Sequence, residues 1–341
     1  MVWFLIVPIL LAAAGFLYQR LGERADVRRF PPPGRKIDSL HVYELGDSGP
    51  SVVFESGIAA TSISWRLVQP RVAQFARTIS YDRAGLGCSD PIRGPRSLTS
   101  MNEQLHSMLA RAGLPPPYIL VGHSFGGMLV RHYAAQYPEE VAGIVLVDAL
   151  WPGEWYPMTT PNKKMLGRGI TLSRRGAMLA RAGVVRFCLT MVQNGSRFLP
   201  RLIAKASGGS GASVLDRLAG EIAKLPQELW PVVASHWSNP KSFEAMAQHF
   251  ECLPLSAEEM AAGSDLGDLP VVVLTAANAP GAPFAAAEPL SANRRDVLAA
   301  GSGHWIMLDE PELVVDAVRT IGRLRAGDNS WTLDGNLQSD G

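Results

Sequence analysis

The sequence has little net charge and few cysteines, and each shortage narrows the possible functions. Its 341 residues hold 32 Lys and Arg against 31 Asp and Glu, a formal net charge of +1. Nothing in that balance favours nucleic acid as a partner. The three cysteines, Cys88, Cys188 and Cys252, lie too far apart for a CxxC or metal-ligand motif. We expect them to pack as small apolar side chains, and one disulfide between two of them is the alternative.

Charge is also missing from the start of the chain. Residues 2–18 carry no charged side chain, and seventeen residues are close to the shortest helix that spans a bilayer. Trp3 and Tyr18 stand at its two ends, where interfacial aromatic residues occur. We predict a single-pass transmembrane anchor over residues 1–19, with the membrane as a partner through residues 2–18. A cleaved signal peptide, hence secretion, and a buried helix remain as alternatives, although no Lys or Arg precedes the run.

A basic, proline-containing stretch follows the apolar run. Residues 20–36 read RLGERADVRRFPPPGRK, and three consecutive prolines do not continue a helix. We predict a semi-rigid spacer there. Its arginines favour a cytoplasmic catalytic part by the positive-inside rule, although the side of the membrane stays open.

Short apolar runs alternate with helical stretches over most of the remaining chain. Strands are expected at 38–44, 51–55, 77–81, 117–122, 142–147, 270–275 and 295–299, and helices near 62–76, 98–113, 125–137 and 311–325. This alternation is typical of an α/β domain with a doubly wound, mostly parallel sheet. It predicts a core over 37–150 and 266–325, interrupted by a helical cap insertion over 151–265. The polar, Gly-rich tail 326–341 is expected to be disordered.

One motif in this pattern carries chemistry. Gly122-His123-Ser124-Phe125-Gly126 is a G-x-S-x-G sequence between an apolar strand and a helix. A nucleophile elbow needs this arrangement, because a strained turn exposes the serine oxygen and the glycines prevent backbone clashes. Ser124 is therefore the predicted nucleophile. We expect the neighbouring His123 side chain to point away from it.

Several segments together resemble a known family. VGHSFGG, VAGIVLVDA and GSGHWIMLDEPELV occur in the order of the α/β-hydrolase superfamily, and YDRAGLGCSD is similar to another of its segments. The resemblance covers about residues 37–325, outside most of 151–265. RRFPPPG after an apolar helix also resembles a membrane-anchored bacterial branch of that superfamily. The resemblance implies an α/β-hydrolase fold and a serine hydrolase of the carboxylesterase or lipase kind.

The resemblance also implies a general base and an acid. His304 follows the last predicted strand within Gly-Ser-Gly-His, where the superfamily has its base. The commonest acid position, after PVVVLT, holds no carboxylate in this chain. We therefore predict Asp148, at the end of the strand 142–147, as the acid that orients His304. Asn278 supplies a hydrogen bond at most, and Asp265 and Asp268 are weaker alternatives.

The oxyanion hole of this superfamily is made of backbone amides. Phe125, directly after the nucleophile, and Ile58, after the strand 51–55, are the predicted donors. Ser56 replaces the histidine that relatives often carry in this loop. Glu55 either orients Arg83 or forms a structural ion pair with it.

The first half of the predicted cap is basic. From Lys163 to Lys205 there are ten Lys or Arg and no Asp or Glu. A solvated helix face accounts for this, and a lid that docks on anionic lipid and admits a lipid-like ester is the alternative.

These residues predict an enzyme that hydrolyses carboxylic esters of a small acyl substrate through an acyl-enzyme, without metal or cofactor. An amide or peptide hydrolase, or an acyltransferase, would use the same three residues. A membrane-tethered binding protein without turnover is the alternative of another class. The oligomeric state and the substrate stay open.

Overall fold

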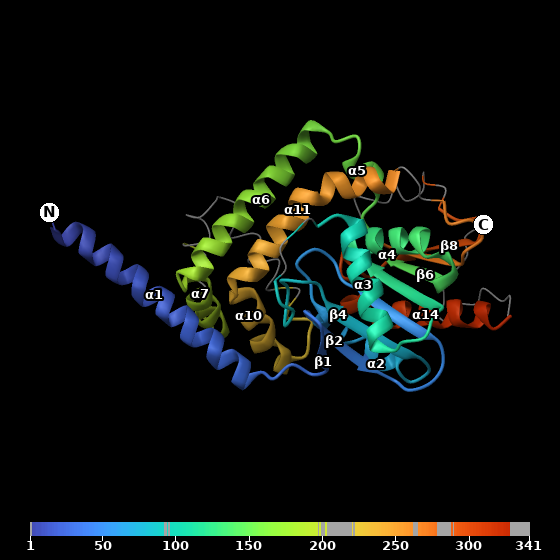
Figure 1. The fold of residues 1–341 in the computed structure, drawn as a ribbon, viewed down its shortest axis with the longest axis horizontal. Coiled ribbons are helices and arrows are strands. Elements are labelled where there is room, and N and C mark those ends of the chain that lie inside the picture. The colour runs from blue at the N-terminus through green and yellow to red at the C-terminus, as the bar shows by residue number, and fades with distance from the viewer. Residues whose placement is uncertain are drawn as a thin grey trace.

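One eight-stranded sheet forms the centre of the computed structural model, which describes residues 2–91, 94, 96–196, 198, 202, 220, 222–261, 265–277, 288 and 290–327 (Figure 1). Its order is β1-β2-β4-β3-β5-β6-β7-β8. The strands are β1 (Arg35–Ile37), β2 (Leu40–Leu45), β3 (Ser51–Glu55), β4 (Arg77–Asp82), β5 (Tyr118–His123), β6 (Val141–Val147), β7 (Val271–Ala276) and β8 (Arg294–Ala299). β1 and β2 pair antiparallel, and the strands from β4 to β8 are parallel. The seven predicted strands are all present, and β1 is the addition.

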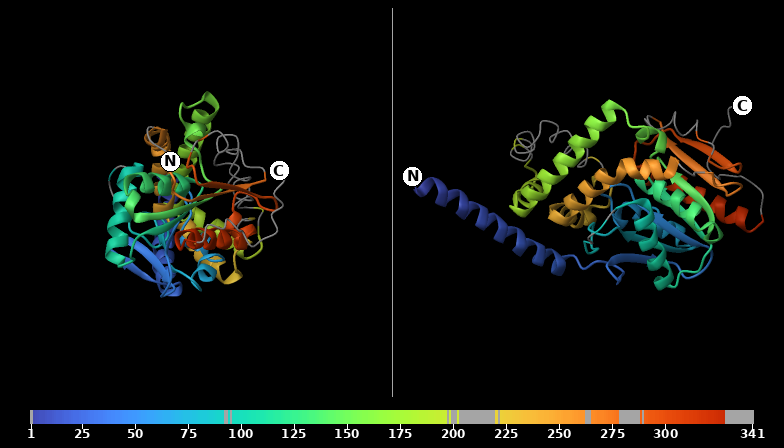
Figure 2. Two further views of the ribbon diagram at one scale, coloured as in Figure 1. Left: turned by 90° about the vertical axis from the view of Figure 1, so that its right-hand side faces the viewer. Right: turned by 45° about the horizontal axis from the view of Figure 1, so that its top comes forward.

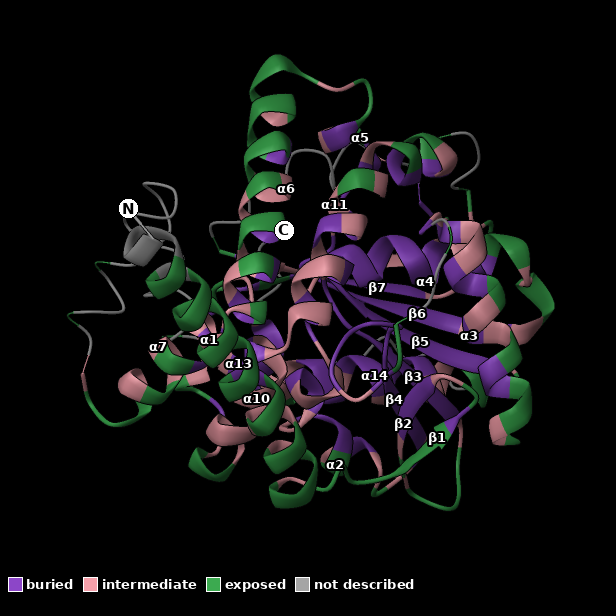
Figure 3. Cartoon of the chain, turned by 60° about the vertical axis from the view of Figure 1, so that its left-hand side comes forward, coloured by how far each residue is buried: buried purple, intermediate pink, exposed green. Residues whose placement is uncertain are grey.

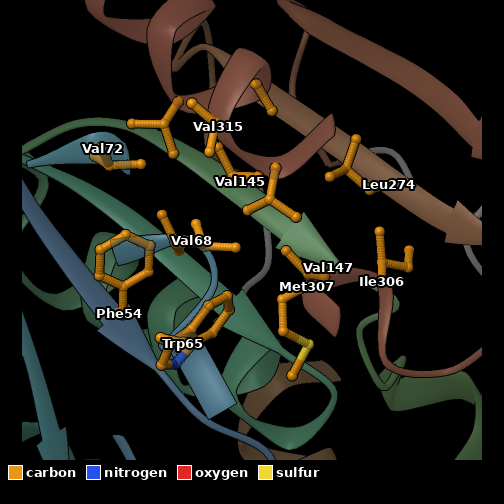
Figure 4. Close-up of a cluster of buried hydrophobic side chains, with 14 of the residues drawn as sticks. Phe54, Trp65, Val68, Val72, Val145, Val147, Leu274, Ile306, Met307 and Val315 are labelled. Atoms are coloured by element: carbon orange, nitrogen blue, oxygen red, sulfur yellow. The ribbon is translucent and has the colours of Figure 1, made fainter. Parts of the chain in front are cut away.

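Helices cover both faces of this sheet, as the alternation of apolar runs predicted. The core helices are α2 (Gln69–Val72), α3 (Leu98–Ala112), α4 (Phe125–Gln136), α13 (Ile306–Asp309) and α14 (Pro311–Arg325), with 3₁₀ turns η1 (Ser62–Trp65) and η2 (Pro138–Glu140). Val53 and Leu120 face α3 and α4, while Phe54 and Val121 belong to the cluster under α2 and α14. Successive strand residues point to opposite faces, so each strand fills two cores. Figures 3 and 4 show the buried strands and the second of these clusters.

Residues between β6 and β7 form helices that we call the cap. They are α5 (Pro152–Trp155), α6 (Thr160–Arg181), α7 (Val184–Gln193), η3 (Gln227–Leu229), α10 (Trp230–Ser238) and α11 (Pro240–Ala261). The long helices α6 and α11 pack side by side (Figure 1). Leu166 and Leu253 from these helices join Phe125 and Met128 of α4 in one apolar cluster. The cap is therefore anchored on the helix that follows Ser124.

The basic face of α6 is partly engaged within the protein. Arg174 lies 2.7 Å from Glu251 and Arg181 lies 2.5 Å from Glu244, both on α11. Within the basic segment, residues 197, 199–201 and 203–205 lie outside the described residues, as does the tail from 328 to 341.

The N-terminal helix corrects the predicted membrane anchor. Helix α1 (Val2–Arg29) has 28 residues and extends away from the body of the protein (Figure 2). None of the helices in the described part of the chain is both long and apolar enough to cross a membrane. The predicted transmembrane helix over residues 1–19, and with it the single-pass membrane localisation, is wrong.

The second half of α1 is bound to the cap instead. The buried Gln19 side chain donates to the Ser238 carbonyl at 2.9 Å and accepts from Arg186 at 3.1 Å. Arg186 also pairs with Asp26 at 2.7 Å. The helix continues through residues 20–29 of the predicted spacer, and the three prolines follow only after it ends.

Candidate active site

Ser124 occupies a strained turn between β5 and α4. Its backbone angles are φ 54° and ψ −121°, a conformation that few residues with a side chain adopt. A Cβ added at Gly122 would lie 2.6 Å from the Gly126 carbonyl oxygen, and one added at Gly126 would lie 2.5 Å from that of Glu55. Both positions therefore require glycine. The strand–turn–helix arrangement predicted around the G-x-S-x-G sequence is present.

Asp148 and His304 meet beside this turn. The Asp148 Oδ2 atom lies 2.6 Å from His304 Nδ1, and its Oδ1 accepts from the Ala276 amide at 3.1 Å. The Asp148 amide donates to the Leu274 carbonyl at 2.8 Å. The carboxylate that starts from the end of β6 thus reaches over the end of β7.

The alternative acids do not share this position. Asp265 and Asp268 are exposed and precede β7, at the end of the strands opposite to Ser124. Asp265 accepts a hydrogen bond from the Gly267 amide at 2.9 Å. Asn278 lies outside the described residues.

The loop that carries His304 is held from both sides. Within it, the Gly303 amide donates to Asp309 at 3.1 Å and the Gly301 amide to Glu310 at 3.0 Å. His123 donates from Nε2 to the His304 carbonyl at 2.9 Å, and the two rings lie 4.7 Å apart. Burial lowers the pKa of His123 well below its ordinary value, and the nearby His304 lowers it further. A neutral His123 therefore ties the base loop to the residue preceding Ser124, a contact that the sequence did not reveal.

The loop after β3 lies against Ser124. A Cβ added at Gly57 would lie 3.2 Å from the Ser124 Cβ atom. The buried Arg83 guanidinium donates to the carbonyls of Ser56 and Gly57 and pairs with Glu55. In a trans peptide the carbonyl and the following N–H point in opposite directions. Holding the Gly57 oxygen on Arg83 therefore turns the Ile58 N–H away from Arg83.

The second predicted oxyanion donor is fixed in the same way. The Ser124 carbonyl accepts from the Gly127 amide at 2.9 Å and from the Leu150 amide at 3.0 Å. The Phe125 N–H of that peptide points the opposite way, and as the first amide of α4 it has no acceptor within the helix. Among the hydrogen bonds between described residues, none is donated by the Ile58 or Phe125 amide. Two fixed N–H groups are thus left for a ligand oxygen.

Glu55 and Arg83 form a network that the sequence only hinted at. Tyr81 donates its hydroxyl to Glu55, so the carboxylate is held by a phenol and a guanidinium. Burial raises the pKa of Glu55, and the positive charge of Arg83 opposes that shift. Through Arg83, the network also holds the loop that precedes Ile58.

One other cluster contains metal-ligating residue types. The ligand atoms of His41, Asp82 and Cys88 lie within 4.8 Å of one another. Asp82 already accepts four hydrogen bonds, from the Ser62 amide and hydroxyl, from His41 Nδ1 and from the Cys88 amide. Burial raises the pKa of the Cys88 thiol to about 11, whereas a metal needs the thiolate. The cluster is a hydrogen-bonding centre. All three cysteines are free.

Comparison with known proteins agrees with this geometry. The alpha/beta hydrolase fold family matches residues 50–311. The chain belongs to this family. The uncharacterised protein YqjL of Bacillus subtilis is 33% identical over 106 residues, which cover 31% of this chain and 42% of that protein. The chain thus matches less than half the length of this curated relative.

Solved structures share the fold of this α/β hydrolase at low sequence identity. A thermophilic esterase from Thermogutta terrifontis superposes with a TM-score of 0.58 and 21% identity, over 84% of this chain and 93% of the esterase. The epoxide hydrolase CorEH superposes with a TM-score of 0.58 and 18% identity, over 81% and 92%. At these identities the likeness concerns the fold.

Proposed function

We propose that this α/β hydrolase is a serine hydrolase that cleaves carboxylic esters, with Ser124, His304 and Asp148 as its catalytic residues. The observation that carries the proposal is the 2.6 Å contact between His304 and Asp148, in a loop tied to the residue before the strained Ser124. The Ile58 and Phe125 amides beside Ser124 would supply the hydrogen-bond donors that stabilise the oxyanion in such a site. The esterase among the structural neighbours is consistent with this reaction.

In the first half of the reaction, the Ser124 hydroxyl oxygen adds to the ester carbonyl carbon while His304 Nε2 takes the hydroxyl proton. The negative charge moves to the carbonyl oxygen, where the Ile58 and Phe125 amides donate to it. Asp148 keeps the His304 Nδ1 proton in place and stabilises the imidazolium. Collapse of the tetrahedral intermediate breaks the bond to the alcohol oxygen, which receives the proton from His304.

In the second half, a water molecule adds to the acyl-enzyme and gives a proton to His304. The second tetrahedral intermediate releases the carboxylic acid, and the proton returns to the Ser124 oxygen. Ser124 argues against the reaction of epoxide hydrolases and dehalogenases, whose nucleophile in this superfamily is an aspartate. An acyltransferase would follow the same steps with an acceptor alcohol in place of water.

Hydrolysis of 4-nitrophenyl acetate by the full chain tests the proposal. We expect a burst of 4-nitrophenol equal to the enzyme concentration wherever deacylation is slow, and turnover that disappears in Ser124→Ala. Product analysis with added methanol separates hydrolysis from acyl transfer. Equal activity of the wild type and a folded Ser124→Ala variant would contradict the proposal.

A further inference from the structure

An apolar pocket lies between the core and the cap, beside the proposed catalytic residues. It holds about 630 Å³ of empty space, part of which is open solvent at its mouth. Core loops and cap helices both line it, and the cap wall includes Ile222, Leu225, Val233 and Trp237. Val233 and Leu225 belong to the apolar cluster beneath α2 and α14. The pocket is therefore a gap at the edge of a hydrophobic core.

Two serine hydroxyls in its wall donate hydrogen bonds within the protein. Ser64 donates to the Thr61 carbonyl at 2.8 Å, and Ser242 donates to the His236 carbonyl at 2.8 Å. His236 Nε2 lies 3.5 Å from Cys88 Sγ, and burial lowers the His236 pKa below its ordinary value. None of the described lining residues is Lys, Arg, Asp or Glu. Such a wall does not compensate the desolvation of a charged ligand.

The pocket adjoins both halves of the catalytic arrangement. Ala59 and Ala60, in its wall, directly follow the oxyanion residue Ile58. Trp305, also in the wall, directly follows His304, and its ring lies 5.1 Å from that of His123. A substrate whose carbonyl is held at Ser124 thus has this apolar space next to it.

We propose that the pocket binds an apolar chain of the substrate, so that the enzyme prefers esters with a hydrocarbon chain to acetate esters of small alcohols. This inference rests on the proposed function and names its substrate class. The chain belongs to either the acyl or the alcohol part of the ester, because both parts are attached to the carbonyl carbon that is held at Ser124. Burying methylene groups against such a wall stabilises the bound substrate, by a factor that grows with each added carbon.

Two matched substitutions on α10 test the pocket. Val233→Phe fills it from the cap wall, whereas Val232→Phe makes the same change one residue away, outside the lining. The measured quantity is kcat/KM for 4-nitrophenyl octanoate divided by kcat/KM for 4-nitrophenyl acetate. We expect this ratio to fall about tenfold or more in Val233→Phe and to keep its wild-type value in Val232→Phe. Octyl acetate against ethyl acetate gives the corresponding ratio for the alcohol part.

Two further experiments guard against misfolding of Val233→Phe and against a lack of turnover. The first is a second variant, and the second is a binding measurement. Ile222→Trp narrows the same pocket from a partly exposed position, and it should change the ratio in the same direction. Binding of the octanoate ester to Ser124→Ala is followed by the fluorescence of Trp237 and Trp305, and Val233→Phe in that background should weaken it about tenfold.

The outcomes separate the two proposals. Unchanged ratios in both series, with a folded Val233→Phe and an active wild type, overturn the pocket and leave the ester hydrolase standing. Binding that depends on Val233 in a protein without turnover overturns the proposed function and leaves the pocket standing.

Discussion

The carboxyl edge of the sheet and the cap are held together by different forces. At the sheet edge, backbone hydrogen bonds fix two of the three proposed catalytic residues: the Asp148 amide donates to the Leu274 carbonyl, and the Ser124 carbonyl accepts from two amides. In the cap, helices are joined by side chains, through apolar contacts and pairs such as Arg174 with Glu251. The edge therefore has one geometry that its glycines and strand ends impose. The arrangement of the cap helices depends on the packing of their side chains.

This difference separates chemistry from selectivity. The residues proposed to break the ester bond lie on the sheet edge, while the wall proposed to select the chain is shared between core loops and the cap. Substitutions at the edge should change kcat, and substitutions in the cap should change the preference among substrates. Each prediction below probes one side of that comparison.

The largest effect is expected at the acid. Asp148→Asn leaves the hydrogen-bond geometry nearly intact but removes the charge that stabilises the His304 imidazolium, and kcat should fall about ten-thousandfold. Asp268→Asn, at the opposite end of the strands, is the matched control and should keep wild-type kcat. Steady-state hydrolysis of 4-nitrophenyl acetate checks both. A similar loss in the two variants would contradict Asp148 as the acid.

The next effect concerns the loop after β3. Arg83→Lys keeps the positive charge but loses the guanidinium that holds the Ser56 and Gly57 carbonyls. A misplaced Ile58 amide should lower kcat about tenfold to a hundredfold with little change in KM. Arg96 is an equally buried arginine that donates to the Ala84 carbonyl at 2.7 Å. If Arg96→Lys lowers kcat by the same factor, the effect of Arg83 is one of general stability.

Acid should weaken the core through Asp82. Burial opposes its ionisation, but the hydrogen bond from His41 and the nearby His236 outweigh burial and lower the pKa from 3.8 to about 2. The unfolded chain therefore binds this proton first, so the stability that Asp82 contributes is present above pH 4 and is lost as the pH falls toward 2. The loss should be on the order of 2 kcal/mol.

Urea unfolding at several pH values measures that loss. In Asp82→Asn the free energy of unfolding should be lower at pH 6 and decline less between pH 4 and 2. Asp90→Asn changes an exposed carboxylate paired with Lys36, and it should keep the wild-type slope. A parallel decline in wild type and Asp82→Asn would rule out Asp82 as the source.

The smallest effect on catalysis is expected at α1. Gln19→Ala removes hydrogen bonds to Ser238 and Arg186, and it should speed amide hydrogen exchange in residues 15–29 while kcat/KM stays within about twofold of wild type. Arg20→Ala, an exposed change on the same helix, should leave the exchange unchanged. A large loss of activity in Gln19→Ala would mean that α1 supports the active site through the cap. Catalysis would then depend on the cap as well as on the sheet edge.

The sequence was informative where a local backbone rule leaves one solution. The glycines around Ser124 and the strand–turn–helix context predicted the elbow, because only glycine fits at 122 and 126. The strands were predicted nearly to the residue, since buried parallel strands are short and continuously apolar. β1 was missed because three residues carry no periodicity.

Contacts between distant segments could not be predicted in the same way. The Arg83 bonds to the loop after β3 and the tie between His123 and His304 join residues 26 and 181 positions apart. The apolar character of residues 2–18 was misread because the sequence alone does not show that the same helix continues to Arg29 and binds the cap through Gln19.

Labelling with a fluorophosphonate probe tests the central claim most directly. The full chain is incubated with the probe, digested, and the modified residue is located by mass spectrometry. The account predicts one adduct, on the Ser124 oxygen, that is absent from Ser124→Ala and forms far more slowly in His304→Ala. A folded wild type that stays unlabelled, or an adduct on another residue that persists in Ser124→Ala, would contradict it.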